Sequence, residues 1–518
     1  MTVSPEQAGP EPTSGPEQTS SEPASPERSA VHGLADDFVA ELCEWIAIPS
    51  IGADPAHHAD VARSAEWLAT ALRRDGWPTV EVWDTGPALP AVYACWPAED
   101  PAAPVVLVYG HHDVQPVDPV EHWQHPPFEA VVRGEELFGR GASDDKGQVA
   151  MHLLGLRAHL AATGQTAPSV TLKLLVEGEE ESGSPHIATL LAEHRTKLGA
   201  DLVVFTDTPL FDRSAPTVCT GQRGHITATI TMTSGNSDLH SGRFGGGVPN
   251  AAIALARLVA AVHDEQGRIA IPGFYDDVRE PSALEREHFA RLPFDEAAWL
   301  AGPADGVTAA TGEAGWTTLE RTWVRPTAEI TGIHGGYTGP GVKTIVPRQA
   351  STALTCRLVP DQQLDRVQEL IRRFVAEHTP PGVTAEVVFH GSGVPPYAVD
   401  IDHPATLAVR DALAAAFDQE VLFSRTGGSG PAALLHAWLD VPVVYFGATL
   451  PDDRIHAPNE RVVLPVLLRG AEALARLWRL LPDRLRTPAA EPAGITAELG
   501  LAGSARPEPG REQEANRA

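Results

Sequence analysis

The sequence has few cysteines. Its 518 residues include only four, and no two of them form a CxxC pair. The four are Cys43, Cys95, Cys219 and Cys356. Such sparse, widely separated thiols argue against a disulfide framework and against a thiolate metal site.

Positive charge and long apolar runs are also scarce. Against 68 acidic residues there are 39 Lys and Arg, which gives a net charge of -29. Nucleic acid and anionic membranes both bind clustered cations, so neither is expected as a partner. No apolar stretch is long enough to span a bilayer, and the N-terminus has no basic start followed by an apolar segment. We expect a cytoplasmic protein that does not enter the membrane.

Large apolar residues are almost missing from both ends of the chain. Residues 1–30 and 487–518 are rich in Pro, Ser, Glu and Gly and cannot bury enough surface to order themselves. We predict two disordered tails that carry no chemistry.

Between the tails, helical and strand-like segments alternate. Apolar residues at helical spacing indicate helices, and β-branched runs bounded by turn residues indicate strands. The predicted helices are 60–74, 145–161, 187–194 and 464–481, and the predicted strands are 80–83, 105–109, 170–176, 202–205 and 441–446. This alternation predicts an α/β domain with a mostly parallel sheet, formed by residues 31–220 and 395–486.

The pattern changes within residues 221–394. Strands that alternate polar and apolar residues are expected at 227–232 and 350–358, and helices at 250–262 and 362–377. Two strand-helix-strand units fit a small inserted α+β domain of the ferredoxin-like kind.

Five motifs of acids and histidines are scattered along the main domain. Three of them directly follow predicted strands, and sites in open α/β sheets collect where strands end. The motifs are Gly-His111-His-Asp113, Ser-Asp144-Asp145-Lys-Gly, Glu179-Glu180-Glu181-Ser-Gly, Thr-Asp207-Thr and Ile-His456-Ala-Pro-Asn-Glu.

Each motif alone has an ordinary structural explanation. His111 fits a structural histidine, Asp144 and Asp145 fit the start of a helix, and the glutamate triplet fits a solvated loop. Like charges at a strand end are costly unless a cation neutralises them, however. Because all five motifs converge on one sheet edge, we predict a metal centre.

A phosphate loop is a competing interpretation of residues 336–344. It requires Gly, four residues, and then Gly-Lys-Ser/Thr. Val342 interrupts that pattern and Pro347 prevents a following helix, so this interpretation is rejected.

The chain resembles the M20 metallopeptidases, and within them the carnosinase-like dipeptidases. Besides the motifs above, the resemblance rests on Ser-Asp-Leu-His240-Ser-Gly-Arg-Phe-Gly-Gly and covers residues 31–481. It implies that the main domain is catalytic and that the insert is a lid or dimerisation domain.

The resemblance also implies two divalent metal ions, with Zn²⁺ expected and Mn²⁺ as the alternative. Asp144 would bridge the two ions, Glu181 and His456 would complete one site, and His111 and Asp207 the other. A water that bridges the metals would be the nucleophile.

Two further residues of the centre take roles by resemblance. Glu180 matches the general base, which moves a proton from the water to the leaving amine. Asp113 matches the carboxylate that orients His111. The family often has a cis peptide at the position of Asp144 and Asp145.

Substrate contacts are implied for four residues: Thr344, Arg357, His390 and Ser429. Arg357 would bind a substrate carboxylate with two hydrogen bonds. The nearby sequence departs from the dipeptidase pattern, because Thr426 replaces a common acidic residue and Gly430 a bulky aliphatic one.

The last implied residue is His240, in the insert. In dimeric branches of the family the matching histidine reaches the partner's active site and polarises the scissile carbonyl. A homodimer joined through the inserts is therefore expected, with His240 acting in trans.

The predicted function is metal-dependent hydrolysis of dipeptides or short peptides. The alternatives within the family are a carboxypeptidase and an N-acyl amino acid deacylase. A non-catalytic binding module on the same fold would be indicated by loss of Glu180 or of a metal ligand, and none is lost.

Overall fold

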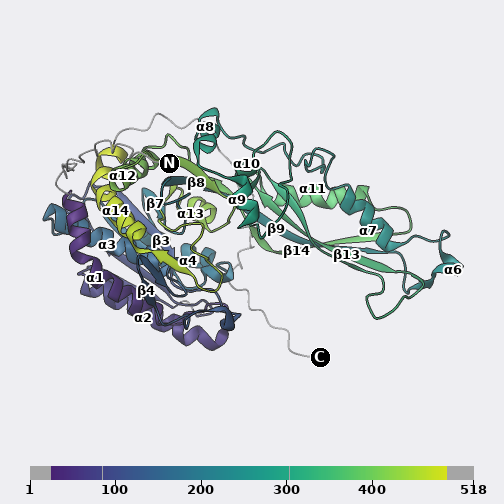
Figure 1. Ribbon diagram of the computed structural model, residues 1–518, viewed down its shortest axis with the longest axis horizontal. Coiled ribbons are helices and arrows are strands. Elements are labelled where there is room, and N and C mark those ends of the chain that lie inside the picture. Colours follow the sequence, from purple (N-terminus) through teal and green to yellow (C-terminus); the bar gives the residue numbers. More distant parts are fainter. Residues whose placement is uncertain (1–24, 85, 303, 487–518) are drawn as a thin grey trace, which may run out of the picture.

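The computed structural model describes residues 25–84, 86–302 and 304–486. A layered main part holds both ends of the described chain, and an elongated insert projects from it (Figure 1). Among the described helices, none combines the length and apolar character needed to cross a bilayer.

The main sheet has six strands in the order β1-β2-β6-β3-β7-β17. Strands β6, β3, β7 and β17 run parallel to one another, and β1 and β2 form an antiparallel edge. The bounds are β1 Thr79–Trp83, β2 Ala91–Trp96, β3 Val105–His111, β6 Thr171–Glu177, β7 Leu202–Phe205 and β17 Val443–Tyr445. The prediction of a mostly parallel α/β sheet is confirmed.

Helices cover this sheet and complete one large core. Helix α3 packs against α1 and α14, and α2 packs against β1 and β2 (Figure 1). Nearly every residue of α3 up to His159 is buried, which fits a helix that is apolar on most sides. The bounds are α1 Pro26–Ile46, α2 His58–Arg74, α3 Lys146–Thr163, α4 Ile187–Glu193, α5 Arg195–Leu198, α12 Pro404–Phe417, α13 Ala432–Leu439 and α14 Leu464–Leu485.

Helices α3 and α14 approach closely at Gly155. A Cβ atom at this position would lie 2.6 Å from the Leu474 Cβ and 3.1 Å from the Ala471 carbonyl oxygen. Real Cβ atoms do not approach other atoms so closely, so the helix contact requires glycine here.

Two three-stranded sheets flank the main sheet, with the orders β15-β8-β16 and β18-β5-β4. Their bounds are β4 Val131–Arg133, β5 Glu136–Phe138, β8 Thr217–Gln222, β15 Tyr397–Ala398, β16 Leu422–Thr426 and β18 Arg461–Val463.

The insert is a four-stranded antiparallel sheet with two main helices. Its strand order is β11-β13-β9-β14, and its chain order is β9, α7, β11, β13, α11, β14. This arrangement confirms the predicted ferredoxin-like α+β insert. The bounds are β9 Gly224–Thr233, α7 Ala251–Ala260, β11 Thr327–Gly335, β13 Gln349–Leu358, α11 Leu364–Glu377 and β14 Thr384–Val394.

One face of the insert sheet forms a core with α7 and α11. Along β9 the residues alternate strictly between buried and half-buried. Ile226, Ile230 and Met232 enter the core, and Ala228 between them is also buried. The alternate positions, which include His225, Thr227 and Thr229, therefore lie on the opposite, polar face.

Three short helices between α7 and β11 had no counterpart among the predicted elements. They are α8 Ala283–Arg291, α9 Glu296–Ala301 and α10 Thr318–Trp323. Capping boxes at Ser282 and Thr317 begin α8 and α10. Two smaller elements, β10 Leu239–His240 and β12 Ile345–Val346, form a separate two-stranded sheet beside α6 Ser241–Phe244.

The prediction of a disordered tail over residues 1–30 is wrong for its last residues, because α1 begins at Pro26. Long-range contacts order this start: the Arg28 side chain bonds Glu472, Asp418 and the Ala416 carbonyl. Residues 1–24 and the second predicted tail, 487–518, lie outside the described residues. The other predicted domain boundaries, near residues 220 and 394, stay predictions.

Candidate metal centre

The predicted metal ligands are supplied by strand ends and loops of the main part. His111 is the last residue of β3, and Asp207 follows β7 two residues after its end. Asp144 lies in the turn before α3, Glu181 in a short helical turn after β6, and His456 in the loop before β18. Because β3, β6 and β7 are parallel, their carboxyl ends meet at one edge.

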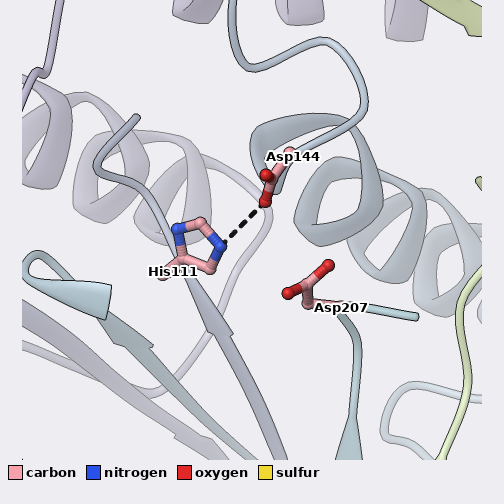
Figure 2. Close-up of side chains that lie close together, drawn as sticks. All are labelled: His111, Asp144 and Asp207. Atoms are coloured by element: carbon pink, nitrogen blue, oxygen red, sulfur yellow. Dashed lines mark ion pairs between the residues drawn. The ribbon is translucent and has the colours of Figure 1, made fainter. Parts of the chain in front are cut away.

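The first group comprises His111, Asp144 and Asp207. One ligand atom of each residue lies within 4.8 Å of the others. Figure 2 shows the three side chains pointing toward a common space, with His111 Nε2 3.2 Å from Asp144 Oδ1.

Asp144 is shared with a second group, which adds Glu181 and His456. Here too the ligand atoms all lie within 4.8 Å of one another. His456 Nε2 is 2.9 Å from Asp144 Oδ2 and 3.2 Å from Glu181 Oε2. The two oxygens of Asp144 thus face different imidazoles, which is the arrangement of a bridging carboxylate.

The acids of the centre have strongly perturbed pKa values. Burial raises the pKa of Asp207 well above its usual range, and the carboxylates of Asp144 and Asp145 raise it further. Burial and Asp144 likewise raise the pKa of Glu181. Burial opposes ionisation of Asp144 as well, but the contacts with His111 and His456 lower its pKa. Crowded, buried acids of this kind are costly to ionise without cations.

The donor set fits two divalent cations. Nε2 of His111 is buried and has no partner with hydrogen-bond geometry, although it lies close to Asp144. Carboxylate oxygens and imidazole nitrogens are the ligands that zinc and manganese accept. A shared carboxylate with one imidazole on each side supplies both sites.

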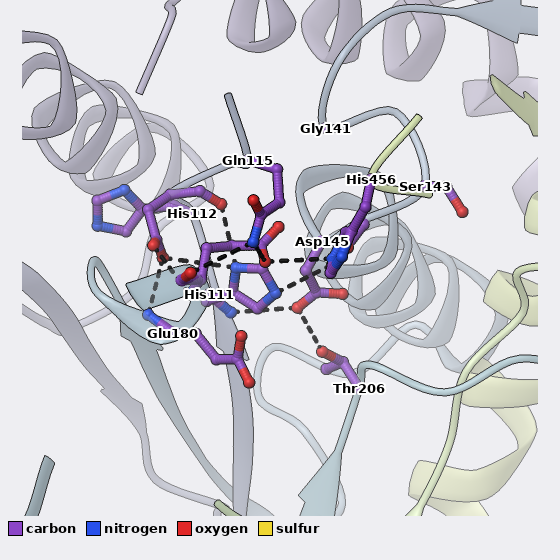
Figure 3. A network of polar contacts seen from close by, with 12 residues as sticks. His111, His112, Gln115, Gly141, Ser143, Asp145, Glu180, Thr206 and His456 are labelled. Carbon is purple, nitrogen blue, oxygen red and sulfur yellow. Dashed lines mark hydrogen bonds and ion pairs between the residues drawn. The ribbon is translucent and has the colours of Figure 1, made fainter. Parts of the chain in front are cut away.

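Glu180 is adjacent to the candidate ligand Glu181 but belongs to neither group. Burial raises the pKa of Glu180 well above its usual range; His111 opposes this, and Asp207, Glu181 and Asp144 add to it. Figure 3 shows the Glu180 carboxyl group beside His111, with no hydrogen bond drawn to it. A carboxyl group that lies beside the centre and belongs to neither ligand group can exchange a proton with a group bound there.

Asp113 connects its own motif, which contains His111, to the glutamate motif. His111 Nδ1 lies 3.1 Å from the backbone carbonyl oxygen of Asp113 and 3.5 Å from its Oδ1. The two carboxylate oxygens of Asp113 accept the backbone N–H groups of Glu180 and Glu181, each at 3.1 Å. Asp113 therefore fixes the imidazole and the glutamate turn together.

Three supporting side chains were not among the predicted site residues: Gln115, Asp145 and Glu460. Gln115 Nε2 donates to Glu181 Oε2 at 2.8 Å. Asp145 Oδ2 accepts the His111 N–H at 3.1 Å and the Thr206 hydroxyl at 2.7 Å (Figure 3). The peptide bond between Asp144 and Asp145 is cis, as the resemblance implies.

Glu460 supports the turn that presents Asp144. Its buried carboxylate accepts the N–H groups of Gly141, Ser143 and Asp144, and it pairs with Arg140 at 2.6 Å. Glu460 is part of the His456 motif, so its position in the sequence was a signal for this role.

The predicted substrate contacts fall into two separate places. Arg357 and His390 lie on β13 and β14, on either side of β9. Arg357 Nη1 donates to Ser429 Oγ at 2.8 Å, which joins the insert to the main part. His390 Nε2 lies 2.8 Å from Thr229 Oγ1. These three predicted residues form one set at the base of the insert.

His240 and Thr344 form the other set. His240 pairs with Ile345 and precedes α6, and the N–H of Ser241 donates to the Thr344 carbonyl. Helix α6 lies at the end of the insert farthest from the main sheet (Figure 1). Neither residue therefore reaches the metal centre of its own chain.

Gly430 departs from the dipeptidase pattern and is confined by its neighbours. A Cβ atom there would lie 3.2 Å from the Phe205 ring and 3.5 Å from Gln222, whose side chain donates to the Gly430 carbonyl. A bulky aliphatic side chain would require Phe205 or Gln222 to move.

Comparisons with known proteins agree with this geometry. The human "Beta-Ala-His dipeptidase" is 28% identical over 461 residues, which cover 86% of this chain and 90% of that protein. The "Cys-Gly metallodipeptidase DUG1" of Candida albicans is 28% identical over 472 residues, covering 87% and 96% of the two chains. The crystal structure of the M20 family metallo-carboxypeptidase Sso-CP2 from Sulfolobus solfataricus matches with a TM-score of 0.74 and 29% identity, covering 86% of this chain and all of that one.

The family model described as peptidase family M20/M25/M40 matches residues 107–480, well over half of the chain. That span contains every residue of the two candidate metal groups. The chain belongs to the M20/M25/M40 peptidase family, and its clustered carboxylates and imidazoles are consistent with a metallopeptidase.

Proposed function

We propose that this protein is a two-metal peptidase that hydrolyses dipeptides or short peptides with a free C-terminal carboxylate. The observation that carries the proposal is Asp144, whose two oxygens face His111 and His456 from opposite groups. Zn²⁺ is the proposed cation, with Mn²⁺ as the alternative, held by His111, Asp144, Asp207, Glu181 and His456.

The residues around the proposed cations have different roles in the reaction. When bound, two divalent cations lower the pKa of water and polarise the scissile carbonyl. Glu180 takes the proton at its carboxylate and delivers it to the leaving amine. Asp113 holds His111 and the Glu180 backbone in place.

The substrate class is supported by the relatives and by the cationic base of the insert. Two of the similar proteins are named dipeptidases, and Arg357 is held by Ser429 at a position where it can meet a carboxylate. A carboxypeptidase is the second candidate, because the similar Sulfolobus solfataricus structure carries that name.

A substrate panel separates these activities. We expect metal-loaded protein to hydrolyse dipeptides such as β-Ala-His and Cys-Gly faster than longer peptides, measured as released amine. Dominant release of C-terminal residues from longer peptides would favour the carboxypeptidase instead. Preferred hydrolysis of N-acetyl amino acids would favour a deacylase.

We further propose a homodimer in which the inserts meet and His240 acts in the partner's site. Within one chain, His240 and Thr344 lie at the far end of the insert, while Arg357 and Ser429 lie at its base. A second copy would bring the two sets together. His240 would then donate to the developing oxyanion of the partner's substrate.

Co-expression of His240→Ala with Glu180→Gln tests the trans arrangement. Each variant alone should be inactive, whereas mixed dimers should regain one intact site: the His240→Ala subunit keeps Glu180 and receives His240 from its partner. Hydrolysis by purified mixed dimers is the measurement. A matched control is His334→Ala, a histidine on the exposed β11 edge, which alone should leave activity unchanged. Verified mixed dimers without activity would refute the trans role.

We propose a cytoplasmic location, small peptides as substrates, and neither nucleic acid nor a membrane as a partner. All four cysteines are free thiols, as expected in a reducing compartment. The net charge of -29 opposes binding to nucleic acid and to anionic membranes.

A further inference from the structure

The base of the insert carries a cluster of basic side chains, none of which pairs with a carboxylate among the described residues. The cluster comprises Arg223, His225 and Arg357. Arg357 donates to the Ser429 hydroxyl and Arg223 to the Gly427 carbonyl. Within the described part of the chain, none of the three forms an ion pair, and the charge of Glu329, which acts on Arg223, remains beyond ion-pair distance. In a protein of net charge -29, such a cluster is a conspicuous exception.

His225 and Arg357 are direct neighbours on the same face of the sheet. They pair across β9 and β13, so their Cβ atoms are about 4.5–5.5 Å apart. Both occupy the half-buried positions of their strands, opposite the insert core. His390, another predicted substrate contact, pairs with Thr227 on this same face, two residues along from His225.

Two side chains of the cluster, His225 and Arg223, have buried nitrogen atoms without a hydrogen-bond partner in the described residues. Nδ1 of His225 is buried without a hydrogen-bond partner, and no hydrogen bond in the described residues involves its imidazole. Nη1 of Arg223 is also buried and unpartnered. Buried polar groups without partners are uncommon and destabilising, unless a ligand completes them.

The basic residues of this cluster indicate that the ligand is an anion. Burial lowers the pKa of His225, and the positive charge of Arg357 lowers it further. Burial and Arg357 also lower the pKa of Arg223, to about 10. The lowered pKa of His225 favours a neutral imidazole, which still has one N–H to donate, and an anion next to it would also be attracted by the charge of Arg357.

We propose that His225 is a substrate-binding residue, whose imidazole N–H donates to the C-terminal carboxylate of the peptide beside Arg357. The inference rests on the proposed function. The Arg357 guanidinium donates to the carboxylate from one side, and the His225 imidazole donates from another. Arg223 adds positive potential, and its backbone and side chain hold the Gly427–Gly428 turn next to Ser429. His225 therefore selects substrates that end in a free carboxylate.

Substitution of His225 tests this assignment through the split between KM and kcat. His225→Phe keeps the ring but removes both nitrogens, and should raise KM for a dipeptide about tenfold to a hundredfold with little change in kcat, since it removes a hydrogen bond to a charged group. For the same dipeptide with an amidated C-terminus, the KM values of the two proteins should agree. His225→Asn and His225→Gln each restore one donor position, and the better of them should recover much of the loss. Thr231→Val, on the same strand and face but away from Arg357, is the control.

A binding measurement distinguishes failure of this inference from failure of the proposed function. Calorimetric titration of metal-loaded protein with L-leucine and L-leucinamide compares the carboxylate with its amide and needs no hydrolysis. If no peptide is hydrolysed, the proposed function is wrong. The titration of unaltered protein and His225→Phe still measures whether His225 contributes to binding of a carboxylate. Equal KM for unaltered protein and His225→Phe, or an equal loss for acid and amide ligands, would overturn the role of His225. Thermal melting of each variant separates such losses from unfolding.

Discussion

Complete removal of divalent cations should abolish peptide hydrolysis, and added Zn²⁺ or Mn²⁺ should restore it. The physical reason is that the crowded acids around Asp144 attract cations through their negative charge. The proposed reaction depends on those cations. The protein should also become less stable, because a ligand present at 100 times its Kd stabilises the folded state by about 2.7 kcal/mol per site. Activity, metal content and melting temperature are measured on the same samples.

Two controls make this result specific. Chelator that has been saturated beforehand with the same cation should leave the activity intact, which excludes a direct effect of the chelator. Elemental analysis should find two cations per chain after reloading. Hydrolysis that persists in samples shown to be free of metal would contradict the proposed function.

Glu180→Gln should lose most turnover, by about 10²–10⁴-fold in kcat, while it retains both cations. The reason is that Glu180 lies next to the centre but outside both ligand groups, so the substitution removes the proton carrier and no predicted ligand. Stopped assays of kcat and metal content by elemental analysis provide the two measurements.

The neighbouring glutamates supply the comparison. Glu179→Gln is the matched control, because Glu179 accepts the Leu89 N–H and contacts His186 away from the cations, and its kcat should be retained. Glu181→Gln should instead lose metal, since Glu181 faces His456. If Glu180→Gln loses its metal and Glu181→Gln keeps it, the roles of the two residues are exchanged.

The sequence alone predicted the main architecture because its signals are local. The buried strands β3 and β7 contain the continuous apolar runs Val105–Tyr109 and Leu202–Phe205, and each run ends directly before a polar motif. In a parallel sheet the carboxyl ends lie at one edge, so motifs far apart in the chain could be placed together without coordinates. The alternation of polar and apolar residues along its strands likewise predicted the α+β insert.

Other features depended on packing that leaves little trace in the sequence. The start of α1 at Pro26 belongs to a segment of tail-like composition, yet Arg28 is fixed by Glu472, more than 400 residues away. Helices α8 to α10 are short, and α8 and α10 begin at local capping boxes. Apolar periodicity over a longer window does not detect such helices.

The sequence by itself determined the residue types of the metal centre and the order in which the chain presents them. Only the tertiary structure decided that His225 lies opposite Arg357, because the register of β9 against β13 sets which side chains become neighbours. Likewise, only the length and direction of the insert separate His240 from the metal centre of its own chain, which a linear motif cannot express. The local sequence decides which residues have side chains that can bind a cation. The folded chain decides which of those side chains lie close enough together to share one.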